Sequence, residues 1–199
     1  THTYTVSSMP AGQGSVSIDA STGEYTYNPD ADFQSLALGE TTTVSFDVTV
    51  TDNDGGSDTE TVSVTITGTN DAPVLTVGSL SATEDGAAVS GTPSFTDVDS
   101  SNTHTYTVSR MPAGQGSVSI DASTGEYTYN PGADFQSLAL GETTTVSFDV
   151  TVTDNVGGSD TETVTVTITG TNDDPILTVG TLDATEDGAS VSGTASFTD

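Results

Sequence analysis

The sequence predicts an all-β protein built from tandem antiparallel β-sandwich domains of about seven strands each. Three observations lead to this expectation. Apolar and polar residues alternate strictly along segments rich in Val, Ile and Thr, which is the pattern of strands with one buried face. Clusters of Gly, Asn, Asp and Ser separate these segments at short intervals, as turns do. The third observation is that the chain repeats itself.

The repeat has a period of 102 residues. Residues 1–97 align with residues 103–199 without a gap, and 87 of the 97 positions are identical. A fixed period indicates an array, and this one has the length of an independent domain. Domains copied in tandem set a length or a valency, whereas a chemical reaction gains little from a copied site. The repeat therefore favours a structural role.

The domain boundaries follow from a short segment that occurs twice. Gly-Thr-Asn-Asp ends each strand-rich stretch, and a proline follows it closely. A boundary after its aspartate gives a partial repeat at residues 1–71, a complete repeat at 72–173 and the beginning of a third at 174–199. We expect an excerpt from a longer array, with partial ends less ordered than the middle unless neighbouring molecules complete them.

Seven segments of the complete repeat are expected to form strands. They span residues 74–77, 87–96, 103–108, 116–121, 126–129, 143–153 and 161–169. Residues 122–125 connect the fourth and fifth segments as a tight hairpin, and residues 154–158 turn the long sixth segment back. Residues 83–86 form another turn, and residues 134–140 are the only helix candidate.

The alternation also identifies the side chains that fill the sandwich. On the two longest strands the inward residues are Val146, Phe148, Val150, Val152, Val164, Val166 and Ile168. Tyr25 and Tyr27, with their equivalents Tyr127 and Tyr129, lie on one hairpin face and are expected in the core. Each repeat has few large apolar residues, so burial alone should give marginal stability.

The charge of the chain is extreme. Asp and Glu number 29 against a single basic residue, Arg110, and the net charge is −28. Such a chain repels nucleic acid and anionic membrane surfaces, so neither is expected as a partner. No apolar run of about 18 residues is present, and we expect no membrane insertion. The folded acids need a neutralising cation, either bound Ca²⁺ or a saline medium that screens them generally.

The acids gather at turns and near the repeated Gly-Thr-Asn-Asp segment. Loops that combine Asp, Asn and Gly suit Ca²⁺, which takes 6–8 oxygen ligands in irregular geometry. The same residues also suit turns without any ion, so that reading stays open for each acid alone. The clusters of the complete repeat are Glu84 with Asp85, Asp97 with Asp99 and Asn102, Asp134, Asp154 with Asn155, and Asn172 with Asp173 and Asp174.

Three segments resemble the calcium-binding motifs of cadherin repeats. Residues 95–106 are similar to the cadherin Asp-x-Asp segment, and residues 152–159 to a loop that supplies an aspartate after a long strand. Residues 166–175 resemble the cadherin linker. Thr-Gly-Thr-Asn-Asp-x-Pro is also typical of the cadherin-like VCBS repeats of large bacterial RTX adhesins. The resemblance covers the whole chain and implies immunoglobulin-like or cadherin-like sandwiches.

The resemblance implies a shared Ca²⁺ site at each junction between domains. At the first junction it implies Asp32, Asn70, Asp71, Asp97, Asp99 and Asp154 as ligands. At the second junction it implies Glu84, Asp134, Asn172, Asp173 and Asp199. The remaining candidates share a cluster or a repeat position with these residues and are Asp52, Asp85, Asn102, Glu186 and Asp187.

Several acids differ from the family pattern or between the two copies of the repeat. Gly68 and Gly170 stand where cadherin linkers have their first aspartate, so each site should hold fewer ions or recruit a backbone carbonyl. Asp30 and Asp54 are absent from the second copy and are therefore dispensable if both copies bind Ca²⁺ alike. Asp174 occurs only in the second copy and is not expected to be required.

The function implied by the resemblance is that of a non-catalytic extender. Ca²⁺ would stiffen the junctions between neighbouring identical repeats, its only expected partners, and the array would project an adhesive tip from a bacterial cell surface. No small-molecule substrate is expected.

The sequence leaves three alternatives to a Ca²⁺-dependent extender. An enzyme is disfavoured because the chain has no Cys, no Lys and one Arg, and because His2 and His104 suit a surface or satisfied histidine. A carbohydrate- or ice-binding module would use the row of Thr in residues 164–169, although Thr also suits the solvent face of a strand. A saline adaptation without specific sites would be stabilised by NaCl as well as by Ca²⁺.

Overall fold

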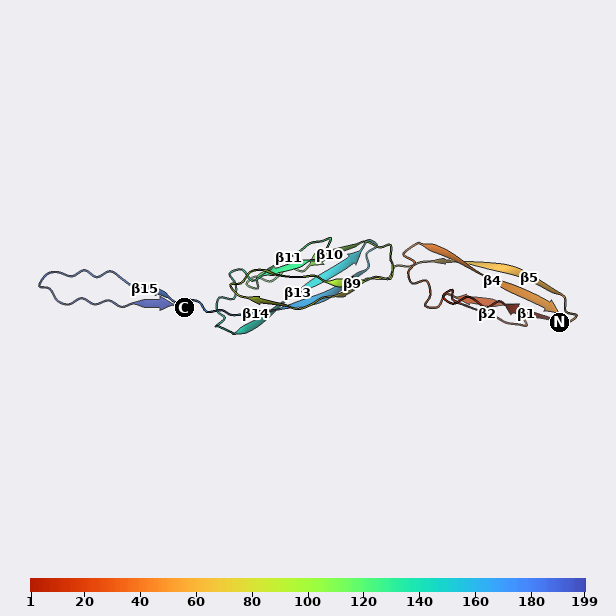
Figure 1. Ribbon diagram of the computed structural model, residues 1–199, viewed down its shortest axis with the longest axis horizontal. Helices are drawn as coiled ribbons and strands as arrows, with labels where there is room; N and C mark the ends of the chain where they lie inside the picture. Colours follow the sequence, from red (N-terminus) through yellow and green to blue (C-terminus); the bar gives the residue numbers. More distant parts are fainter.

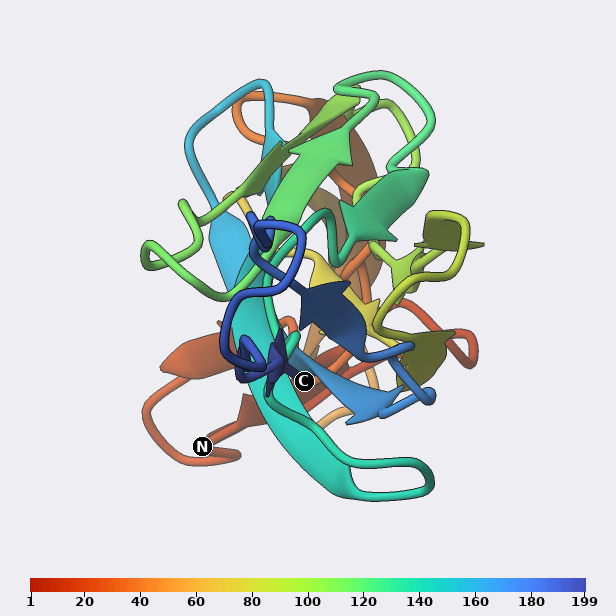
Figure 2. The same ribbon diagram turned by 90° about the vertical axis from the view of Figure 1, so that its left-hand side faces the viewer.

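The computed structural model describes all 199 residues and contains sixteen β-strands and no helix. The strands fall into three groups, β1–β5, β6–β14 and β15–β16, and no sheet joins strands of different groups. Figure 1 shows the groups lying end to end along a rod, and Figure 2 looks along its length. No helix of the chain has the length and apolarity needed to cross a membrane.

The middle group is the complete sandwich. Its strands are β6 (Val74–Thr76), β7 (Leu80–Thr83), β8 (Val89–Gly91), β9 (Ser94–Thr96), β10 (His104–Val108), β11 (Ser117–Ile120), β12 (Tyr127–Asn130), β13 (Thr143–Asp154) and β14 (Ser159–Thr169). One sheet has the order β10-β13-β14-β7 and another the order β11-β12-β8, while β6 pairs with β9. All pairs are antiparallel except β7 with β14, which run parallel. The all-β sandwich prediction is therefore confirmed.

The outer groups repeat parts of this arrangement. The first contains β1 (His2–Val6), β2 (Ser15–Ile18), β3 (Tyr25–Asn28), β4 (Thr41–Asp52) and β5 (Ser57–Thr67). It forms the sheet β1-β4-β5 and the hairpin β2-β3, in the same registers as β10-β13-β14 and β11-β12. The third group is the hairpin of β15 (Ile176–Thr178) and β16 (Ser196–Thr198), which matches β6 and β9.

The only contiguous core of buried residues lies in the middle group. Its members are Leu75, Ala82, Tyr106, Tyr127, Tyr129, Val146, Phe148, Val150, Val152, Val164, Val166 and Ile168. Every inward residue expected from the alternation on the two long strands is among them, as are both tyrosines of the second hairpin. In the first group the equivalent Tyr25 is 47% exposed, because no strands equivalent to β6–β9 cover it.

Three local predictions were wrong. Residues 87–96 form two strands, because the chain leaves β12 after β8 and joins β6 as β9, with the buried Pro93 between them. The strand β7 was not expected, since its four residues include only one large apolar side chain, Leu80. Residues 134–140 form turns, because Phe135 has a φ of 72°, which a right-handed helix excludes.

Candidate metal sites at the domain junctions

Asp99 anchors the linker at the first junction. Its side chain is 1% exposed, and its Oδ2 accepts hydrogen bonds from the Asp71 amide at 2.8 Å and from Asn102 Nδ2 at 3.4 Å. The other oxygen, Oδ1, is buried and has no hydrogen-bond partner. The Asp97 carboxylate orients the loop by accepting the Asp99 amide at 2.9 Å. A buried carboxylate oxygen without a partner is costly, and a bound cation would remove that cost.

Asp154 lies beside it at the end of β13. Its Oδ1 accepts the amides of Val156, Gly157 and Gly158 at 2.6–2.9 Å, and its Oδ2 accepts Asn70 Nδ2 at 2.9 Å. Burial opposes ionisation of this carboxyl, but the bonds from Asn70 and the three amides outweigh it and lower its pKa. Asp154 is thus held as a carboxylate against the linker.

His104 belongs to the same cluster as a partner of Asp97. Its Nε2 lies 2.6 Å from Asp97 Oδ2, and its ring centroid lies 4.3 Å from that of Phe95. The expectation of a satisfied histidine is confirmed here, whereas the equivalent His2 is exposed.

Glu84 is the centre of the second junction. Its side chain is fully buried, and its Oε1 accepts the Thr171 amide at 2.6 Å and the Thr171 hydroxyl at 3.2 Å. Its Oε2 has no partner. The neighbouring Asp85 accepts Gln136 Nε2 at 3.0 Å and contacts the Thr171 hydroxyl at 3.4 Å. Residues 84 and 85 lie at the start of the next linker because β7, which precedes them, runs parallel to β14, which precedes the linker.

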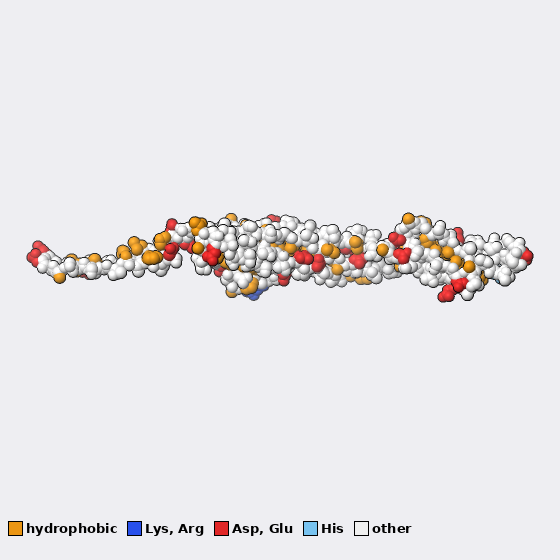
Figure 3. Space-filling model, turned by 90° about the horizontal axis from the view of Figure 1, so that it is seen from below, with side chains coloured by type: hydrophobic (Ala, Val, Ile, Leu, Met, Phe, Trp, Pro, Cys, Tyr) orange, Lys and Arg blue, Asp and Glu red, His pale blue; other side chains and the backbone are white.

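Four acids act on the pKa of Asp173 in the second linker. Burial raises the pKa of Asp173, and the negative charges of Asp85, Glu84, Asp199 and Asp174 raise it further. Figure 3 shows acidic side chains gathered where the thin hairpin meets the middle group. The repulsion between Asp173 and these four charges favours a cation that binds near Asp173.

The two junctions show the two sides of the contact between a linker and its neighbouring domains. The first holds a linker against the domain that follows it, through Asp99 and Asp154, and the second holds a linker against the domain that precedes it, through Glu84 and Asp85. Each half contains one of the only two buried side-chain polar atoms without a partner, Asp99 Oδ1 and Glu84 Oε2. No group of three or more His, Asp or Glu side chains is arranged closely enough to hold a metal ion. The donor set is all oxygen apart from the His104 nitrogen, which suits Ca²⁺.

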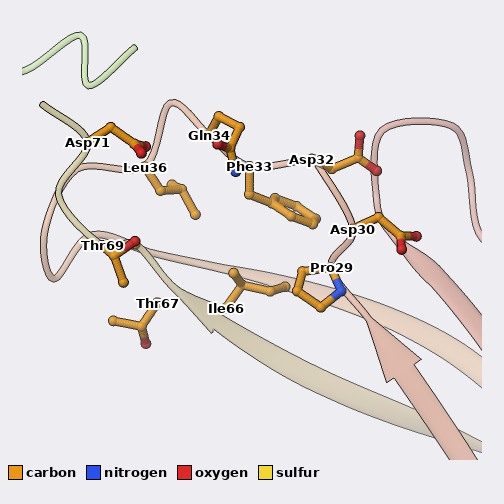
Figure 4. Close-up of a pocket in the computed structure, with 11 residues that line it drawn as sticks. Pro29, Asp30, Asp32, Phe33, Gln34, Leu36, Ile66, Thr67, Thr69 and Asp71 are labelled. Carbon is orange, nitrogen blue, oxygen red and sulfur yellow. The ribbon is translucent and has the colours of Figure 1, made fainter. Parts of the chain in front are cut away.

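Several candidate ligands lie apart from these clusters. Asp32 and Asp134 each accept a backbone amide within their own domain at 2.8 Å, from Gly14 and Gly116. Figure 4 shows Asp32 and Asp71 at opposite ends of a pocket.

The other separated candidates are tied to their own loops or exposed. Asp52 caps its own turn by accepting the amides of Asp54 and Gly56. Asn172 donates to the Asp173 carbonyl at 3.1 Å, and Glu186 and Asp187 are exposed on the third group.

Three further residues support the junctions and were not identified from the sequence. Thr171 satisfies Glu84, and Gln136 satisfies Asp85. Asp160, at the start of β14, accepts the Leu75 amide at 2.7 Å and fixes the chain just after the first linker. Asp160 is 85 positions from its partner, so no local pattern could reveal it. Thr171 lies within the repeated Gly-Thr-Asn-Asp segment, which was the available signal.

The Thr-rich strands show how their outer hydroxyls are used. Thr165, Thr167 and Thr169 alternate with buried residues of β14 and therefore lie on the outer face. On the same face the hydroxyls of Thr151 and Thr161 bond to each other at 2.8 Å, which leaves fewer of them free for a ligand.

A family model described as "Bacterial cadherin-like domain" matches residues 1–68 and 70–170. A comparison with curated proteins finds no match.

Solved structures with a similar fold include three from cadherins. Mouse cadherin-23 EC22-24 has a TM-score of 0.54 at 21% identity over 88% of this chain and 56% of that one. Protocadherin gamma B7 cadherin domains 1-4 have a TM-score of 0.52 at 21% identity over 90% and 44%. The protocadherin gamma B4 extracellular domain has 0.55 at 18% identity over 98% and 32%. This chain thus spans between a third and just over half of their length, and the likeness shows a shared fold.

Proposed function

Because this chain belongs to the bacterial cadherin-like domain family, we propose that it is a non-catalytic extender of a bacterial cell-surface adhesin of the RTX type. Its repeats are extracellular, and Ca²⁺ bound at the junctions stiffens them into a rod that carries an adhesive tip. The partners are the neighbouring repeats of the same chain.

The observation that carries this proposal is the pair of unpartnered buried carboxylate oxygens, Glu84 Oε2 and Asp99 Oδ1. They belong to opposite faces of a junction, so a complete junction places both halves around one linker. The proposed ligands of a complete junction come from three places. They are Glu84 and Asp85 from the preceding domain, Asn70 with Asp71 or its equivalent Asp173 from the linker, and Asp97, Asp99, Asn102 and Asp154 from the following domain.

Ca²⁺ binding would contribute strongly to the stability of these domains. With affinities of about 10⁻⁴–10⁻³ M and about 10 mM Ca²⁺, each site adds roughly 1.4–2.7 kcal/mol. A domain of this size has a total stability of about 5–15 kcal/mol. With a net charge of −28 and one cationic side chain, the folded chain has almost no internal means of neutralising its acids. Several sites are therefore a substantial part of the total.

The mechanism of extension follows from the linker. Asn70 and Asp71 already bond to the following domain, while Glu84 and Thr171 tie the next linker to the preceding one. A cation between these faces would fix the angle between domains. Without it, like charges across the junction repel, and the array becomes a flexible string.

Small-angle X-ray scattering of the chain in EDTA and in CaCl₂ tests this proposal. We expect a longer maximum dimension and a narrower cross-section in CaCl₂, and no such change in NaCl of equal ionic strength. Asp99→Asn should reduce the Ca²⁺ response, whereas the exposed Glu162→Gln should leave it unchanged. Identical scattering in CaCl₂ and EDTA would contradict the extender mechanism.

A further inference from the structure

The loop between β10 and β11 carries the only basic side chain of the chain. Residues 109–116 connect the two strands, and Arg110 stands there where the first copy of the repeat has Ser8. The six residues that follow, Met-Pro-Ala-Gly-Gln-Gly, are the same in both copies. The two copies of this loop therefore differ in this one side chain.

Arg110 has no acidic partner within the chain. Its side chain is exposed, and the only ion pair of the chain joins His104 to Asp97. None of the 29 acids is therefore paired with the guanidinium of Arg110. Because a guanidinium pairs strongly with a carboxylate, this side chain is available to a carboxylate of another molecule.

The backbone that follows Arg110 is not anchored to the sandwich. Residues 110–114 take part in none of the backbone–backbone hydrogen bonds outside the strands, and all of them except the half-buried Met111 are exposed. The other long loops of the middle group, residues 97–103, 131–142 and 154–158, each contain several such bonds. A hollow of about 540 Å³ lies between the loop and the start of β11. Exposed loop segments of this kind are preferred points of proteolytic cleavage, because they can extend into a protease by local opening alone.

The two ends of the loop are held, in contrast to its centre. The Ser109 amide donates to the Asp149 carbonyl at 2.9 Å, and the Ser109 hydroxyl accepts the Asp149 amide at 2.8 Å. At the other end the Gln115 carbonyl accepts the Tyr129 hydroxyl at 3.0 Å. Opening of residues 110–114 therefore does not propagate into β10 or β11.

We propose that the peptide bond between Arg110 and Met111 is a processing site for a trypsin-type serine protease, which holds an arginine side chain on a carboxylate in its S1 pocket. The reaction is a hydrolysis in which water supplies the new carboxylate oxygen of Arg110. The bond from the Arg110 carbonyl carbon to the Met111 nitrogen breaks, and that nitrogen gains a proton to become a new amino terminus. This chain offers such a protease no second site, because it contains no other Arg and no Lys.

The cut leaves the sandwich assembled. The first fragment supplies β6–β10 and the second supplies β11–β14, and three strand pairs join them, namely β10 with β13, β7 with β14 and β8 with β12. Hydrogen bonds from the Leu75 amide to Asp160 and from the Thr171 amide to Glu84 also link the two fragments. The processed rod therefore separates at this domain only when the domain unfolds.

Digestion of the folded full chain with trypsin in CaCl₂ tests this proposal. Mass spectrometry should identify two fragments, residues 1–110 and 111–199, which co-elute in size-exclusion chromatography until denaturant is added. The matched control moves the basic residue onto an anchored strand by combining Arg110→Ser with Thr107→Arg, an exposed position of β10 that pairs with Thr151. The wild type should be cut about 100-fold faster than this variant, because the strand must unfold before a protease can bind it. Equal rates would overturn the proposal, since both chains would then be cut only through unfolding.

Low concentrations of urea give a second readout that does not depend on the stability of the variant. The rate for the wild type, measured relative to that of a small peptide substrate, should stay constant, because local opening of the loop exposes little surface. The rate for the strand variant should rise with urea, because unfolding exposes the core. A wild-type rate that rises with urea in the same way would also overturn the proposal.

Discussion

Glu84→Gln separates the role of a buried carboxylate in folding from its role in binding a cation. The side chain is fully buried, one oxygen is satisfied by Thr171, and the other has no partner. Glutamine has the same shape and keeps an oxygen for Thr171. The substitution therefore removes the charge while preserving the packing, so its effect should change sign with the Ca²⁺ concentration.

The magnitude follows from the two states of the site. In EDTA, an unpartnered buried polar group costs about 1–3 kcal/mol, and removal of the charge recovers part of that. In Ca²⁺, the lost site was contributing roughly 1.4–2.7 kcal/mol. Since about 1 kcal/mol shifts the Tm of a domain near 100 residues by 4–8 °C, the Ca²⁺-dependent rise in Tm should shrink by about 6–20 °C.

Differential scanning calorimetry of the full chain in EDTA and in CaCl₂ measures both effects. The expected result is a Tm at or above the wild-type value in EDTA and below it in CaCl₂. Glu162→Gln makes the same chemical change at an exposed position of β14 and should follow the wild type in both buffers. A variant that is destabilised equally with and without Ca²⁺ would refute the reasoning, because Glu84 would then act through packing alone.

Three further predictions concern Asp99, the dependence of the Tm on acid pH, and the ionisation of Tyr129. Asp99→Ala should lower the free energy of unfolding in EDTA by about 1–3 kcal/mol, because the Asp71 amide loses its acceptor, and calorimetric titration should show weaker Ca²⁺ binding. In EDTA, mild acid should raise the Tm, because the folded state raises the pKa of Asp173. The resulting contribution to the free energy of unfolding is fully present below the ordinary pKa of 3.8 and is lost as the pH rises through the raised pKa. Stronger acid should lower the Tm, because hydrogen bonds from the Ser123 hydroxyl and from two amides hold the pKa of Asp121 at about 2. The contribution of these bonds to the free energy of unfolding is lost as the pH falls from 3.8 to 2. Burial, aided by the Asp134 charge, raises the pKa of Tyr129 to about 12. Its contribution to the free energy of unfolding is therefore lost as the pH rises from 10 to 12, and titration by ultraviolet absorbance should detect its ionisation only close to unfolding. A Tm in EDTA that falls steadily as the pH is lowered from neutral would contradict the prediction on acid pH. Ionisation of Tyr129 near pH 10 in the folded chain would contradict the prediction on Tyr129.

The long strands were predictable because their chemistry is local. Val164, Val166 and Ile168 alternate with Thr along β14, and all three are fully buried. The strand β7 was not predictable in this way, because its pairing with β14 joins segments more than 80 residues apart. The turn at Phe135 was mistaken for a possible helix because composition does not reveal a left-handed φ at a single residue.

The sequence indicated which acids lie near the junctions, whereas the residues that hydrogen-bond to them were not predictable. The linker motif and the Asp-x-Asp segment identified Asp71 and Asp99, which the structure brings together. Asp32 was assigned to the same site from the family pattern; its carboxylate accepts the Gly14 amide, and its role as a ligand stays a prediction. The contact of Asp160 with the Leu75 amide depends on the tertiary fold, because the two residues are 85 positions apart, whereas Thr171 lies in the repeated linker segment.

The most direct test of the account is the thermal unfolding of the chain in EDTA, in millimolar CaCl₂ and in NaCl of matched ionic strength. Specific sites predict a large rise in Tm with CaCl₂ and a small one with NaCl, because a divalent ion bound at the unpartnered oxygens of Glu84 and Asp99 stabilises them more than screening by Na⁺ does. An equal rise in both salts would contradict the account and leave general screening of the 29 acids as the source of stability.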